Sequence, residues 1–157
     1  MPLPDPVVWS SELTASAGST VENADLSGGY ARASISWLRH ESPWSNGAFV
    51  GATLGLEAWL NKHGTGYPSP HALFVIGWRL GAFEPRTEYG FDIVQVDRRE
   101  EGIGVGLWVP RAGLSVGVRL KQVRVSVEAK AQYRFTLLLP DQAQFLLGLR
   151  LDCGLRS

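Results

Sequence analysis

The sequence predicts an all-β protein, an antiparallel up-and-down barrel of about eight strands with a polar, charge-networked interior. Three observations lead to this prediction. Apolar and polar residues alternate with period two through most of the 157 residues. Segments rich in Gly, Pro and polar residues separate the alternating runs, and no run has the period of an amphipathic helix. The polar positions are mostly Gly, Ser and Thr, with charges of both signs among them.

The clearest strand covers residues 123–137. Its odd positions are apolar or aromatic and its even positions are polar or charged. A period of two places successive side chains on opposite faces of a strand. The run exceeds the usual strand length of about 5–6 residues, and it reaches the roughly 9–11 residues that a tilted strand needs to cross a bilayer.

Four strands are predicted in the first half of the chain, where apolar residues take every second position of residues 7–18, 30–39, 47–60 and 71–83. Turn-forming segments separate them. The polar stretch 19–29 divides the first two strands, and residues 40–46, which include Pro43, precede the third. Residues 61–70 (NKHGTGYPSP) are dense in Gly and Pro, which predicts a loop before the fourth strand.

The second half adds strands at residues 89–97, 103–120 and 145–155 to the one at 123–137, with turns at 84–88, 98–102, 121–122 and 138–144. Residues 89–97 alternate poorly, because Val94 and Val96 are out of phase with Phe91. Within 103–120 the apolar positions change from odd to even near Pro110–Gly113, which predicts a β-bulge in one strand or a hairpin turn. Bacterial outer-membrane barrels have an even number of strands, which favours the bulge and a total of eight.

The composition of the polar face predicts that this face lines a narrow lumen. Abundant glycine gains nothing on a solvent-facing strand, whereas the tight interior of an eight-stranded barrel requires small residues. Enclosed charges are tolerated when they are paired, so we expect a network of ion pairs. Its predicted members are Glu12, Arg32, Glu57, Arg79, Asp92, Arg119, Arg124, Glu128, Lys130, Arg134, Arg150 and Asp152.

The opposite face is apolar, and it carries aromatic residues near strand ends, where lipid-facing barrels have aromatic girdles. The predicted girdle residues are Trp9, Trp37, Trp78, Tyr133, Phe135 and Phe145. We therefore expect a monomeric transmembrane barrel surrounded by a lipid bilayer or detergent. Alternation alone also fits a soluble β-barrel or sandwich that binds a small apolar ligand in its interior, and this alternative stays open.

The pattern over residues 7–155 resembles the small outer-membrane β-barrels of Gram-negative bacteria, the class that includes the transmembrane domain of outer membrane protein A and outer membrane protein X. The resemblance implies an outer-membrane location, both termini in the periplasm and contact with lipopolysaccharide. The chain begins Met1-Pro2-Leu3-Pro4, without the basic and apolar regions of a secretory signal. We therefore expect a mature chain with an added methionine.

Several partners and cofactors are not expected. Fifteen basic and fifteen acidic residues cancel, so nucleic acid is not an expected partner. Cys153 is the only cysteine, and the three histidines lack metal-ligand spacing, so we expect no disulfide, metal or cofactor.

The expected role is non-catalytic, either structural or a narrow passage at most. Some members of the resembled class are lipid A deacylases or acyltransferases that use a His and a Ser near the outer rim. His63 or His71 with Ser69 could be arranged in that way. An enzyme that modifies lipid A is therefore the alternative function.

Overall fold

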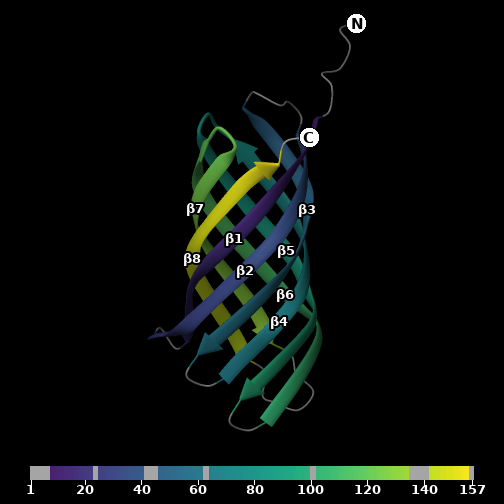
Figure 1. Ribbon diagram of the computed structural model, residues 1–157, viewed down its shortest axis with the longest axis vertical. Helices are drawn as coiled ribbons and strands as arrows, with labels where there is room; N and C mark the ends of the chain where they lie inside the picture. The colour runs from purple at the N-terminus through teal and green to yellow at the C-terminus, as the bar shows by residue number, and fades with distance from the viewer. Residues whose placement is uncertain are drawn as a thin grey trace, which may run out of the picture.

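The computed structural model describes residues 8–22, 25–40, 46–61, 64–99, 102–134 and 142–155. They form eight strands: β1 (Val8–Glu22), β2 (Asp25–His40), β3 (Gly47–Asn61), β4 (Gly64–Arg79), β5 (Phe83–Arg99), β6 (Gly102–Leu120), β7 (Val123–Arg134) and β8 (Gln142–Leu155). The strands pair antiparallel in chain order, and β8 pairs with β1 to close the barrel (Figure 1). The predicted fold class is confirmed. His63, Phe135 and the side chain of Arg134 lie outside the described part.

Apart from β7, the strands are longer than the alternation predicts, and the described lengths run from 12 residues in β7 to 19 in β6. Residues 135–137 of the predicted strand 123–137 lie outside the described part. β2 begins at Asp25 and β4 at Gly64, so strand replaces much of the predicted loops 19–29 and 61–70. Pairing to neighbouring strands overrides the local turn signals of Gly and Pro there, because strand formation depends on cross-strand context. Within the described ranges, no helix is long and apolar enough to cross a membrane.

The predicted turn at residues 84–88 is misplaced. The chain turns at Gly81–Ala82 instead, where Leu80 bridges Phe83 and Gly81 adopts a φ of +64°. The predicted turn at residues 121–122 is present: the chain turns at Lys121–Gln122, between β6 and β7, and Lys121 has a φ of +57°. Because β5 begins at Phe83, its charged residues Glu84, Arg86 and Glu88 point into the barrel.

β6 is one strand with a bulge, as the even strand count favours, but the bulge lies earlier than predicted. Leu107 and Trp108 both face outward, and Trp108 has a φ of +56°. Val109 and Arg111 consequently face the lumen. On β5 the pairing steps from Asp92 to Val94, which explains the poor alternation there. A positive φ in a bulky residue is strained and marks a locally irregular wall.

The outer surface is apolar and the interior is polar, which is the arrangement of a transmembrane barrel. Exposed large hydrophobic residues lie on all eight strands, whereas most buried side chains are polar or charged. The soluble alternative required the opposite arrangement, so it is excluded. We call the rim where β1 begins and β8 ends the terminal rim, and the opposite rim the loop rim (Figure 1).

The described members of the predicted aromatic girdle are all exposed on the outer surface: Trp9, Trp37, Trp78, Tyr133 and Phe145. The three tryptophans lie toward the terminal rim, and the other two residues lie toward the loop rim.

Two small apolar clusters fill the lumen between the charges. Leu38, Phe49 and Val75 pack together toward the terminal rim, and Tyr30, Trp59 and Leu146 pack together toward the loop rim. Because aliphatic and aromatic groups occupy the barrel at both levels, the interior is a packed core rather than an open channel.

Candidate active site

The lumen holds equal numbers of acidic and basic side chains among the described residues. The acidic ones are Glu12, Glu57, Glu84, Glu88, Asp92, Asp97, Glu128 and Asp152. The basic ones are Arg32, Arg79, Arg86, Arg111, Arg119, Arg124, Lys130 and Arg150. All are buried except Arg79 and Arg119, which are half-buried near the terminal rim.

Five of these charged residues were missed in the sequence: Glu84, Arg86, Glu88, Asp97 and Arg111. The period-two order of Glu84, Arg86 and Glu88 was the available signal, and the assumed turn at 84–88 concealed it. Asp97 follows the pairing step on β5, and Arg111 follows the bulge on β6. Each irregularity exchanges the inward-facing and outward-facing positions of the residues after it.

Near the terminal rim, Glu84 is the centre of an arginine cluster. Arg86 donates to Glu84 and, at 2.8 Å, to Glu12. Arg119 reaches the same two carboxylates, and Arg79 donates to Glu84 at 3.1 Å. Each carboxylate here therefore contacts at least two arginines.

Midway along the barrel, two carboxylates share one arginine. Arg150 donates to both Glu88 and Asp152. Arg32 donates to Glu88 at 2.7 Å, and Arg124 donates to Asp152 at 2.8 Å. The ion pairs thus join β2, β5, β7 and β8 across the lumen.

Toward the loop rim, Arg111 links two carboxylates. Its guanidinium donates to Asp92 at 2.6 Å and to Glu57 at 2.7 Å. Lys130 also donates to Glu57 at 2.7 Å, and its ammonium contacts Glu128 at 3.1 Å. Among the described residues Arg111 is the only cation in contact with Asp92.

β4 places a serine and a histidine beside these carboxylates. Ser69 and His71 lie two residues apart on the lumen face, and both are buried. In the strand register, Ser69 lies opposite Glu57 and His71 lies opposite Asp92. Serine, histidine and carboxylate thus occupy neighbouring positions on three adjacent strands.

Ser69 and His71 do not hydrogen-bond to each other. The Ser69 hydroxyl donates to the Tyr67 carbonyl at 2.9 Å. Neither ring nitrogen of His71 has a hydrogen-bond partner among the described residues, although the side chain is 1% exposed. A buried histidine with unpaired nitrogens is costly as a purely structural residue, and such groups call for a functional explanation.

The barrel wall is interrupted beside Ser69. β4 pairs with β5 at Gly66 and again at His71, and no pair joins the described residues 67–70 to β5. Pro68 and Pro70 flank Ser69 and have no N–H to donate to a ladder.

An outer groove of about 480 Å³ lies against the same segment. Its lining residues come from the loop-rim halves of β2, β3 and β4, and they include Ala31, Ala58, Leu60, Tyr67 and Pro68. The groove ends one residue from Ser69, so the lipid-facing surface and the serine are close at the interrupted ladder.

The constellation has the parts that acyl transfer requires. A serine hydroxyl serves as nucleophile when a histidine accepts its proton and a carboxylate orients that histidine. The apo distance between nucleophile and base is often long and shortens only with substrate. Among the described residues, no group of three or more His, Cys, Asp or Glu side chains could hold a metal ion.

No protein-family model and no curated protein matches this chain. Among solved structures, it is similar to the crystal structure of the outer membrane enzyme PagL. The two chains are 16% identical with a TM-score of 0.59, and the match covers 92% of this chain and 99% of the PagL chain. At this identity the likeness shows the fold, which is that of the small outer-membrane β-barrels.

This comparison corrects the expectation of a non-catalytic structural or passage role. The matched barrel is an enzyme, so this fold is compatible with catalysis in the outer membrane.

Proposed function

We propose that this protein is an outer-membrane enzyme that hydrolyses an ester of a membrane lipid, with lipid A of lipopolysaccharide as the substrate. Ser69 acts as the nucleophile and His71 as the general base. One observation carries the proposal: Ser69 lies on the lumen face of β4 within the interruption of its ladder with β5, and His71, on the same face, lies at the end of that interruption, opposite Asp92. Such bulged and irregular strand segments recur next to active sites.

The reaction follows from these groups. The Ser69 Oγ attacks the ester carbonyl carbon while His71 takes the hydroxyl proton. The alcohol then leaves with that proton, and an acyl-serine forms. Water, deprotonated by His71, attacks the acyl-serine, releases the fatty acid and restores the serine. Asp92, which Arg111 holds through Oδ1 and which lies opposite His71 in the register, is the carboxylate that we assign to orient the histidine in the reacting complex.

Access from the membrane supports a lipid substrate. The groove beside Tyr67 and Pro68 faces outward and is lined mostly by apolar residues, so an acyl chain can lie in it while its ester approaches Ser69. Exposed apolar residues on every strand support a bilayer around the whole barrel. An outer-membrane location and a monomeric state belong to the same proposal.

The test is hydrolysis by the full chain in mixed micelles of detergent and purified lipopolysaccharide, with released fatty acid measured by mass spectrometry. We expect Ser69→Ala and His71→Gln each to lower turnover by roughly 10³-fold or more. Matched controls are Ser16→Ala and His40→Gln, a buried serine and a buried histidine elsewhere in the lumen, which should retain activity.

Folding and serine reactivity need their own measurements. Unheated and boiled samples are compared by electrophoresis, because a closed barrel migrates differently before boiling. A fluorophosphonate probe should label the folded wild type at Ser69 and leave Ser69→Ala unlabelled. If folded Ser69→Ala and His71→Gln both turn over lipopolysaccharide at the wild-type rate, the proposed site is wrong.

A further inference from the structure

The wall between β6 and β7 is interrupted at a second position. The described ladder between these strands ends at the pair Arg111 and Gln132. β7 continues beyond it and pairs with β8 as far as Arg134. On β6 the preceding residue is Pro110, which has no N–H to extend the ladder. β6 and β7 therefore separate at this point.

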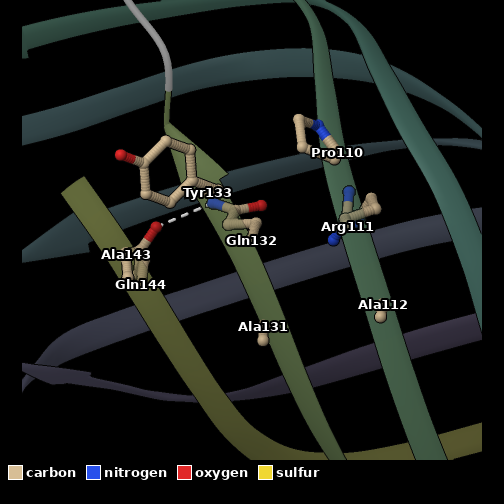
Figure 2. A pocket seen from close by; sticks show the side chains of 8 residues that line it. All are labelled: Pro110, Arg111, Ala112, Ala131, Gln132, Tyr133, Ala143 and Gln144. Atoms are coloured by element: carbon tan, nitrogen blue, oxygen red, sulfur yellow. Dashed lines mark hydrogen bonds between the residues drawn. The ribbon is translucent and has the colours of Figure 1, made fainter. Parts of the chain in front are cut away.

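A groove of about 350 Å³ lies at this separation (Figure 2). Its outward lining consists of the exposed residues Pro110, Ala112, Ala131, Tyr133 and Ala143. Three alanines in neighbouring strands leave room for a narrow apolar group. No outward lining residue carries a charge, so this groove suits hydrocarbon rather than an anionic headgroup.

The inner side of the groove is polar. Arg111, Gln132 and Gln144 line it from the lumen face. Arg111 already donates to Asp92 and Glu57, so its guanidinium is engaged. The Gln132 amide donates to Gln144 Oε1 at 2.7 Å, and Figure 2 shows this bond and the Gln132 carbonyl in the space between β7 and β6.

The Gln132 carbonyl is an acceptor without a donor. Gln132 is 3% exposed, and its Oε1 has no hydrogen-bond partner among the described residues. Leaving a buried acceptor unpaired costs free energy, and a ligand that supplies an N–H or O–H recovers it. A ligand with only ester and phosphate oxygens cannot do so, because those groups accept hydrogen bonds.

We propose that this groove binds an acyl chain of a membrane lipid that carries a hydroxyl or amide N–H close to the chain, with that donor bonded to Gln132 Oε1. The hydrocarbon lies along Ala112, Ala131 and Ala143, and the donor reaches inward where β6 and β7 separate. The inference does not depend on Ser69 or His71, which lie on another strand.

A neighbouring groove provides an internal comparison. It lies between β6, β7 and β8 and is lined by Leu114, Val127, Ala129 and Leu149 among others. The one charged residue in its lining, Glu128, accepts from Tyr30 and contacts Lys130. This groove therefore has an apolar lining without an unpaired acceptor, and it should not discriminate between lipids.

The experiment is native mass spectrometry of the full chain in detergent micelles with one lipid at a time. Lipid A and an N-acylsphingosine both carry the required donors and come from different sources, whereas dimyristoylphosphatidylcholine lacks them. We expect the wild type to retain the two donor lipids about fivefold to tenfold more than phosphatidylcholine, which is the change in a binding constant that one additional hydrogen bond produces. Retention of lipid A alone among the donor lipids identifies lipopolysaccharide as the source.

The variants separate the groove from the rest of the surface. Gln132→Leu should remove the preference, and Ala131→Leu should lower retention of all donor lipids by filling the groove. The matched controls are Gln95→Leu, another buried lumen amide, and Ala129→Leu in the neighbouring groove; both should retain the preference.

Three results would overturn the inference. The first is equal retention of phosphatidylcholine and the donor lipids by the wild type. The second is an unchanged preference in folded Gln132→Leu, with folding checked by electrophoretic mobility before and after boiling. The third is a dimer peak in the wild type that Ala131→Leu abolishes, which would make a second copy the occupant.

Discussion

The substitution Arg111→Met should destabilise the barrel more than Arg86→Met, although both remove one buried arginine. Arg111 is the only cation that contacts Asp92 among the described residues, so its loss leaves that carboxylate buried and unpaired. Breaking a buried ion pair by removing one partner costs about 3–5 kcal/mol. Methionine keeps most of the side-chain volume, so little of this cost comes from a cavity.

Arg86 differs because its partners have other cations. Glu12 also contacts Arg119, and Glu84 also contacts Arg79 and Arg119. Arg86→Met therefore removes hydrogen bonds without leaving a carboxylate unpaired. The expected cost is about 1.5–3 kcal/mol, the range for a hydrogen bond to a charged group.

The assay is reversible urea unfolding in lipid vesicles, followed by tryptophan fluorescence and by mobility of unheated samples on gels. The double variant Arg111→Met with Asp92→Asn tests the cause. Removing the unpaired charge should recover about 1 kcal/mol or more of the free energy of unfolding, as contacting residues couple by about 0.5–3 kcal/mol. If Arg86→Met proves at least as costly as Arg111→Met, or Asp92→Asn recovers nothing, the assignment of the cost to an unpaired carboxylate is wrong.

Two further predictions concern the packed lumen and the lipid-facing surface. Gly77→Ala should cost about 1–3 kcal/mol in the same assay, because the added Cβ would meet the buried Phe49 ring, whereas Gly47→Ala has free space and should be nearly neutral. Equal costs would contradict tight packing around Phe49. Leu149→Arg, at the middle of β8, should cost about 2–4 kcal/mol in vesicles, and Leu120→Arg at the terminal rim about 0–1 kcal/mol. Similar values at both positions would contradict a hydrocarbon belt centred on Leu149.

The alternation by itself predicted strands with one apolar and one polar face, and the composition of the polar face predicted which of the two lines the barrel. Strand side chains alternate between faces whatever the partner strand is, so residues such as Arg124, Glu128 and Lys130 could be placed together on the polar face from their positions alone, and the structure buries all three. The glycine and serine content of the same face indicated a narrow lumen. These features are local and periodic, and a single sequence expresses them directly.

The alternation does not locate a bulge, at which the inward and outward positions of a strand exchange. A bulge of one residue reverses every position that follows it, so with the bulge placed at Pro110–Gly113 Val109 was assigned to the wrong face and Arg111 to neither face. The bulge lies at Leu107–Trp108, opposite the step on β5 from Asp92 to Val94, and this alignment of the two strands cannot be read from the β6 sequence alone.

Only the tertiary structure decided which groups meet. The sequence offered Ser69 with either His63 or His71, but strand register placed Glu57 and Asp92 opposite Ser69 and His71 and brought Arg111 to both carboxylates. It also showed that the β4–β5 ladder and the β6–β7 ladder are interrupted beside prolines. Contacts across a closed barrel join residues far apart in the chain, so their partners follow from register and closure rather than from any local pattern.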